Sequence, residues 1–176
     1  GTAHEQGLAH GESLRESIEK NIDVYLNRFD KEFGIGKQDL LVNAGVYMNK
    51  LQDQSPEYVS AMNGIAESSN REILEIAMLN LRYELLYYAL GKIYMDESVD
   101  GCTSFALLPE ASQNNHVVMG QNWDWIPDVD CVLVTSTDSD GLRRTSFTEA
   151  GIFAGKPGMN SEGVGLAVNG MCSTAD

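Results

Sequence analysis

The sequence predicts an α+β fold in which a helical N-terminal segment is followed by an antiparallel sheet. Apolar side chains before position 100 recur at intervals of three and four residues, the spacing of helices with one buried face. After Cys102 the chain consists of short β-prone runs separated by turn-forming residues. Because no low-complexity tract or flexible linker separates the two parts, we expect them to pack together as one domain.

The predicted helices cover residues 11–34, 37–51, 55–69 and 71–95. The third begins with Ser55 as N-cap and Pro56 at the first helical position, a strong start signal. The fourth is apolar on nearly every side, which indicates burial against several neighbours. Its Asn80 and Glu84 lie four residues apart on one face, and we expect them to join a buried structural network because buried polar groups need partners.

The predicted strands are short and lie between clear turns. They cover residues 102–108, 116–121, 131–136, 144–148 and 164–169. The sequences "DSDG" and "NSEG" contain the residues that reverse the chain most readily. Consecutive strands joined in this way pair antiparallel.

Composition excludes some partners. The chain has 12 basic and 26 acidic residues and a formal charge of -14, a field that repels nucleic acids and anionic membrane surfaces. No apolar run approaches the ~20 residues that span a bilayer, and no signal sequence opens the chain. The chain begins with Gly1 rather than Met, so the compartment stays open, as does a homo-oligomeric state.

Metal and cofactor sites are not expected. His4, His10 and His116 do not show metal-ligand spacing among themselves or with the cysteines. No phosphate-binding glycine loop is present. Cys131 lies inside an apolar β-prone run, where we expect a small buried side chain.

The boundary between the two parts, "DGCTSF", places Cys102 between Gly101 and the hydroxyl residues Thr103 and Ser104. One interpretation pairs the Cys102 thiol with the His116 imidazole. However, His116 follows a loop-like sequence, and we expect it to be exposed.

A second interpretation requires no histidine. If the Gly101–Cys102 bond is cut, Cys102 carries both a thiol and a free α-amine, whose ordinary pKa near ~8 suits a general base at neutral pH. Gly101 lacks a Cβ and therefore permits a strained backbone with an accessible carbonyl.

Three motifs resemble a known family. "DGCTSF", "GQNWDW" and "TEAGIFAGKPGMNSEGVGLAVN" are similar, in this order, to the acyl-coenzyme A:6-aminopenicillanic acid acyltransferase family. These are self-processing N-terminal nucleophile hydrolases related to the choloylglycine hydrolases. "GLAHGESLRESI" also resembles the family's opening segment, and "GIAESSNREILEIAMLNLRYE" its last helix before the nucleophile.

The resemblance implies roles for individual residues. Cys102 would be the nucleophile, with cleavage on its N-terminal side, and Asp124 would orient its amine. Asn169 would donate a hydrogen bond to the oxyanion, although a structural role at a strand end is nearly as well supported. Trp123 and Trp125 would line the pocket or the core. Thr103 and Ser104 would complete the pocket.

The resemblance also implies a division of the chain. Residues 1–101 would form a helical α-chain, and residues 102–176 the start of a β-chain that stays associated with it. The family's αββα sandwich needs two sheets, whereas this sequence provides strands for a partial one. A further asparagine and an arginine that the family contributes from its later half have no counterpart here. We therefore expect an incomplete domain.

The expected function is that of a self-cleaving cysteine amidohydrolase or acyltransferase. Its substrate would be a small N-acyl compound with a linear amide bond, or an acyl thioester, and its intermediate an acyl-enzyme on Cys102. No cofactor is implied, and acyl-coenzyme A would be a substrate if the reaction is transfer. The alternative is a non-catalytic α+β binding or scaffold protein that retains the fold.

Overall fold

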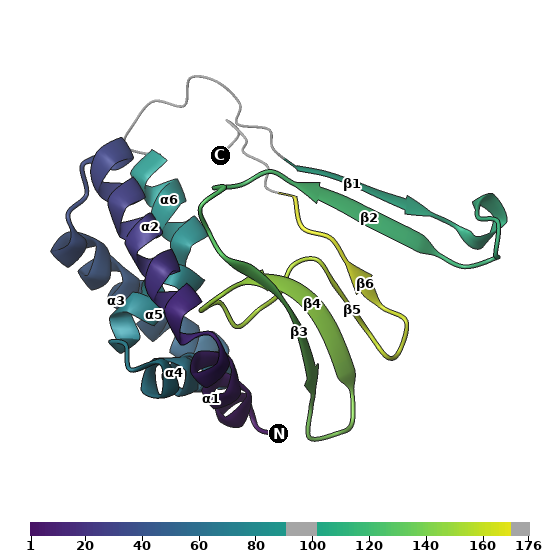
Figure 1. The fold of residues 1–176 in the computed structure, drawn as a ribbon, viewed down its shortest axis with the longest axis horizontal. Coiled ribbons are helices and arrows are strands. Elements are labelled where there is room, and N and C mark those ends of the chain that lie inside the picture. The colour runs from purple at the N-terminus through teal and green to yellow at the C-terminus, as the bar shows by residue number, and fades with distance from the viewer. Residues whose placement is uncertain (91–101, 170–176) are drawn as a thin grey trace.

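The computed structural model of the 176-residue chain describes residues 1–90 and 102–169. In these residues helices α1–α6 precede antiparallel strands β1–β6, so the predicted α+β class is confirmed. Figure 1 shows the helices gathered on one side of the molecule and the strands on the other.

The helices are α1 (Ala3–Ser13), α2 (Arg15–Phe33), α3 (Lys37–Gln54), α4 (Pro56–Ser69), α5 (Ile73–Asn80) and α6 (Arg82–Leu90). Helix α1 begins earlier than predicted because Thr2 and Glu5 form a capping box. The backbone breaks at Leu14, so the predicted helix 11–34 is divided between α1 and α2. Pro56 opens α4 as predicted, although the Ser55 side chain makes no capping hydrogen bond.

The fourth predicted helix is also divided, at Leu81, into α5 and α6. The break lies between Asn80 and Arg82. The Asn80 side chain binds Gly151, just after β4, and the Arg82 side chain binds Glu149, the last residue of β4. The prediction that Glu84 joins a buried network is wrong, because its side chain is exposed. Asn80, in contrast, has several hydrogen-bond partners. Ending α5 at Asn80 removes the i,i+4 relation that placed the two residues on one helix face.

Helices α1 and α4 approach each other closely because glycines face the contact. A Cβ at Gly7 would lie 2.1 Å from the Ala61 carbonyl oxygen, and one at Gly64 would lie 2.3 Å from the His4 carbonyl oxygen. Larger residues at these two positions would force the helices apart. The first helix is thereby held against the middle of the helical region.

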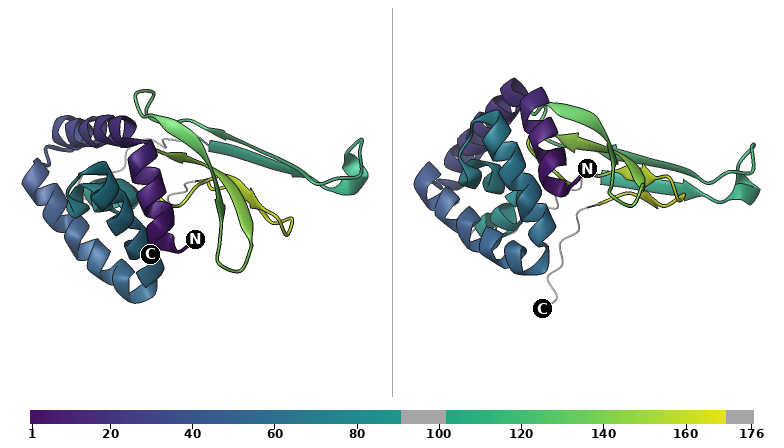
Figure 2. Two further views of the ribbon diagram at one scale, coloured as in Figure 1. Left: turned by 60° about the horizontal axis from the view of Figure 1, so that its bottom comes forward. Right: turned by 90° about the horizontal axis from the view of Figure 1, so that it is seen from below.

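The strands form two sheets. Strands β1 (Cys102–Leu107) and β2 (Val118–Trp123) make a hairpin, and the second sheet has the order β3-β4-β5-β6. Its strands are β3 (Cys131–Thr137), β4 (Arg143–Glu149), β5 (Gly158–Asn160) and β6 (Gly165–Leu166). Figures 1 and 2 show the hairpin extending away from the helices. Each predicted strand is present, the last as a two-residue strand, and β5 was not predicted.

The hydrophobic core lies mainly among the helices. Its largest buried side chains include Tyr25, Phe29, Leu40 and Ile65. From the strand region, the buried core residues are Ala150 and Ile152, which directly follow β4. The turn after β4 is therefore the point at which the strand region enters the helical core.

Residues 148–152, here called the TEAGI segment, are all buried. Asn21 of α2 donates to the Ala150 carbonyl at 3.0 Å, and Asn80 of α5 donates to the Gly151 carbonyl at 2.8 Å. The Gly151 amide donates to His10 Nε2 of α1 at 2.9 Å. Three helices thus bind the backbone of this one segment.

Candidate functional site

Cys102 is the first residue of β1 and is half-buried. Its register partner in the hairpin is Trp123, and the partner of Ser104 is Gln121. Directly opposite residues of an antiparallel pair share one face, and side chains alternate along each strand. Cys102, Ser104, Gln121 and Trp123 therefore lie on one face of the hairpin, and Thr103 lies on the other.

Asn169 approaches this face from beyond β6. Its Nδ2 donates to Ser104 Oγ at 3.1 Å, and its Oδ1 accepts from Gln121 Nε2 at 2.9 Å. Gln121 also accepts from the Val168 amide through Oε1. The structure thus brings together Ser104 and Asn169, two of the sequence-predicted site residues, through a direct hydrogen bond, and Gln121 binds Asn169 from the neighbouring strand.

Asp124 directly follows β2 and is exposed. It lies one residue beyond Trp123, the register partner of Cys102. Within residues 1–90 and 102–169 its carboxylate has no hydrogen bond or ion pair. The other half of the predicted cleavage site, Gly101, lies outside the described residues.

Trp123 and Trp125 form an aromatic wall beside Cys102. Their rings stack with centroids 5.8 Å apart, and the Phe147 ring meets Trp123 edge-on at 6.0 Å. Both tryptophans line a cavity of about 520 Å³, together with Gln121, Ile126, Pro127, Val129, Cys131, Phe147 and Pro157. Aromatic and apolar walls with one amide are suited to an acyl group.

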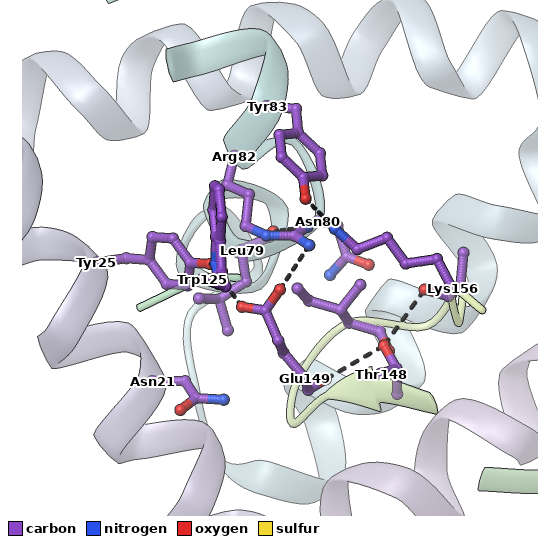
Figure 3. A network of polar contacts seen from close by, with 12 residues as sticks. Asn21, Tyr25, Leu79, Asn80, Arg82, Tyr83, Trp125, Thr148, Glu149 and Lys156 are labelled. Carbon is purple, nitrogen blue, oxygen red and sulfur yellow. Dashed lines mark hydrogen bonds and ion pairs between the residues drawn. The ribbon is translucent and has the colours of Figure 1, made fainter. Parts of the chain in front are cut away.

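A buried polar network lies where the TEAGI segment meets the helices, as Figure 3 shows. Glu149 accepts hydrogen bonds from Arg82 Nη2 at 2.6 Å and from Tyr25 Oη at 2.5 Å. Trp125 Nε1 donates to Tyr25 Oη at 2.6 Å, which connects the aromatic wall to the network. The network therefore fixes the orientation of Trp125 from within the core.

Burial and pairing set the ionisation of this network. Burial opposes the charge of Arg82, but Glu149 and the neighbouring tyrosines outweigh it and raise the pKa of Arg82. Burial also raises the pKa of Tyr25, so its hydroxyl stays protonated and can donate to Glu149. The Nε atom of Arg82 is buried without a hydrogen-bond partner among the described residues.

Sequence reasoning missed Lys156 and Tyr83, which also adjoin the wall. Lys156 Nζ donates to Tyr83 Oη and lies 4.7 Å from the centre of the Trp123 ring. Lys156 stands in the motif "GKPGMN", but nothing in its spacing distinguishes it from a surface lysine. Its significance comes from contacts with residues of α6 and β2 that are distant in sequence.

The alternative thiol partner lies elsewhere. His116 is exposed in the loop before β2, and its backbone amide donates to Ser112 Oγ. Cys131 is half-buried rather than fully buried, and burial raises the pKa of its thiol. A groove of about 990 Å³ lies between α1 and strands β3–β6 and does not include Cys102.

Neither a membrane-spanning helix nor a cluster of metal-binding side chains is found in the described part of the chain. No helix there is long and apolar enough to cross a membrane. Nor does that part contain a cluster of three or more histidine, cysteine, aspartate or glutamate side chains with metal-binding geometry.

Comparison with known proteins relates this chain to an acyltransferase. No family model matches the chain. The chain is 32% identical over 174 residues to the acyl-coenzyme A:6-aminopenicillanic-acid-acyltransferase 40 kDa form of Emericella nidulans. The alignment covers 97% of this chain but 45% of that protein, so the chain spans about half the length of the relative. The chain is thus similar, along nearly its whole length, to part of an acyl-coenzyme A:6-aminopenicillanic acid acyltransferase, which confirms the family resemblance carried by its motifs.

Proposed function

We propose that the protein containing this chain is a cysteine amidohydrolase or acyltransferase that activates itself by cutting the Gly101–Cys102 bond. Its substrates are small N-acyl compounds with a linear amide bond, and acyl-coenzyme A if the reaction is transfer. The observation that carries the proposal is the position of Cys102: it begins a strand, beside an aromatic wall, in a chain similar to an acyltransferase.

Cleavage would separate the helical α-chain, residues 1–101, from a β-chain that starts at Cys102. The new α-amine accepts the thiol proton, and Sγ attacks the substrate's carbonyl carbon. The carbon-nitrogen bond breaks, the leaving amine takes the proton, and a thioester remains on Cys102. Water then releases a carboxylic acid and restores the thiol, or an acceptor amine takes the acyl group instead.

Two other residues complete the proposed site. Asp124 follows the register partner of Cys102, so its carboxylate is suited to orienting the terminal ammonium. Asn169 is a candidate hydrogen-bond donor to the oxyanion that forms on the substrate. Its Nδ2 group donates one N–H to Ser104 Oγ and carries a second N–H that could serve the substrate.

Self-cleavage is tested by intact-mass measurement on the full-length protein. Wild-type protein should yield two fragments divided at Gly101–Cys102, and Cys102→Ala should stay whole. Cys131→Ala is the matched control, since Cys131 also begins a strand and is also half-buried, and this variant should still be cut. Wild-type protein that stays whole after prolonged incubation at neutral pH would rule out self-processing.

A further inference from the structure

The backbone holds Lys156 rigidly beside the aromatic wall. The Lys156 amide donates to the Phe147 carbonyl at 2.8 Å, and the Phe147 amide donates to the Pro157 carbonyl at 2.9 Å. The Phe147 ring contacts Trp123. Lys156 is therefore fixed to β4 next to the partner strand of Cys102, rather than carried on a loose loop.

The Lys156 side chain is enclosed by three aromatic rings. Its Nζ lies 3.9 Å from the centre of the Tyr83 ring, 4.7 Å from that of Trp123 and 5.8 Å from that of Trp125. Figure 3 shows the side chain extending toward Tyr83, to whose hydroxyl Nζ donates. In this position the lysine has lost part of its hydration. The attraction between its cation and the aromatic rings compensates for only part of that loss.

Burial and one neighbouring cation favour the neutral form of the Lys156 side chain. Burial lowers the pKa of Lys156 to about 7, and the Arg82 cation acts in the same direction. Glu149, Cys102 and Cys131 act in the opposite direction. Tyr83 is a neutral partner, because burial raises the pKa of its hydroxyl. The lowered pKa makes Lys156 a more readily available proton acceptor near neutral pH than an ordinary lysine.

Trp123 is a common neighbour of Cys102 and this amine. Trp123 is directly opposite Cys102 in the hairpin, on the same face, and Lys156 Nζ lies over the Trp123 ring. Cys102 and Lys156 interact electrostatically, as do Cys102 and Tyr83. As long as Cys102 is bonded to residue 101, its own nitrogen is an amide and cannot act as a base.

We propose that Lys156 is the proton acceptor for the Cys102 thiol in the uncut chain. The S–H bond breaks, an N–H bond forms on Lys156 Nζ, and the thiolate attacks the carbonyl carbon of residue 101. The carbon-nitrogen bond then breaks, the departing nitrogen of Cys102 takes the proton from the Lys156 ammonium, and a thioester forms. Water hydrolyses the thioester. This role rests on the proposed self-cleavage, and it deepens that proposal by naming the base.

The test compares variants of the full-length protein with two readouts. Cleavage is followed by intact mass, and alkylation of Cys102 by iodoacetamide is followed by mass spectrometry of its peptide. Lys156→Met should slow cleavage by about 10² or more, the usual contribution of a proton-transfer group, and should slow alkylation near pH 7. Lys156→Arg keeps the charge but cannot accept a proton, so it should alkylate readily and still be cut slowly.

Lys50→Met is the matched control, because Lys50 also lies over an aromatic ring, at 6.0 Å from the centre of Tyr47, but on α3. It should behave as wild type in both readouts. Cleavage of Lys156→Arg at the wild-type rate would overturn the proposal, and this holds even if Lys156→Met fails to fold. If wild-type protein is never cut, the proposed function fails. The alkylation readout still tests Lys156 in that case, because equal alkylation rates of Cys102 in Lys156→Met and wild type would refute the coupling of Lys156 to Cys102.

Discussion

The helical and strand regions of this protein bury their apolar side chains to very different extents. The helical region closes around a core in which Tyr25, Phe29 and Ile65 are inaccessible to solvent. In the strand region Leu133 and Met159 are 74% and 67% exposed. Yet the candidate chemistry, centred on Cys102, lies in the strand region. Stability and the proposed chemistry are therefore located in different parts of the chain, joined at the TEAGI segment.

The largest expected effect separates chemistry from stability. Asp124→Asn should lower turnover of the full-length protein by as much as ~10⁴, the cost seen when an orienting carboxylate is lost. Its free energy of unfolding should change little, because the side chain is exposed. Turnover of an N-acyl substrate and urea unfolding measure the two effects. Asp128→Asn, an exposed residue of the same loop, serves as control, and near-normal turnover in Asp124→Asn would assign Asp124 a structural role only.

The second prediction concerns the junction of the two regions. Glu149→Ala should lower the free energy of unfolding by about 3–5 kcal/mol, because it leaves Arg82 charged and buried without its partner. Urea unfolding provides the measurement. Glu84→Ala removes an exposed carboxylate from α6 and should change stability by less than about 0.5 kcal/mol. A similar small change in Glu149→Ala would mean that the network does not join the regions energetically.

The third prediction tests the same junction through pH. Burial lowers the pKa of His10 from 6.5 to about 4, and its Nε2 accepts a hydrogen bond from Gly151. Between these pH values the unfolded chain binds more protons at this site than the folded protein does, so stability falls as pH falls from 6.5 to about 4. The loss should reach about 3 kcal/mol. Unfolding of wild type and His10→Gln across this range isolates the contribution, and parallel curves would contradict it.

The smallest effect concerns the exposed face of the sheet. We expect the rest of the full-length protein to cover Leu133, as the second sheet of an αββα sandwich would. Leu133→Ser should then destabilise the full-length protein by about 1–2 kcal/mol through lost apolar burial. Val42→Ser, at a site 61% exposed on α3, should have almost no effect. If the two substitutions change the free energy of unfolding equally, the expectation that another part of the protein covers this sheet face is wrong.

Local patterns in the sequence predicted which helices and strands form better than they predicted where each one begins and ends. Apolar spacing identified the helices, but it continues across Leu81, where the helix breaks because Asn80 and Arg82 bind the TEAGI segment. Strand β5, residues Gly158–Asn160, was missed because it is too short to show alternation.

The candidate site was predicted in part. The motifs identified Cys102, and the structure brings Ser104 and Asn169 together on its face of the hairpin. Lys156 and Arg82 could not be found in this way. Their side chains acquire unusual surroundings only through partners such as Tyr83 and Glu149, which lie more than sixty positions away in the sequence.

The TEAGI segment also has a consequence for the order of folding. Its contacts with Tyr25, Asn21 and His10 connect positions separated by 124, 129 and 141 residues. Closing such long loops costs more conformational entropy than closing the shorter loops between packed helices. We therefore expect the helices to assemble first and this segment to dock late. Substitutions in it should accelerate unfolding while leaving the rate of folding almost unchanged.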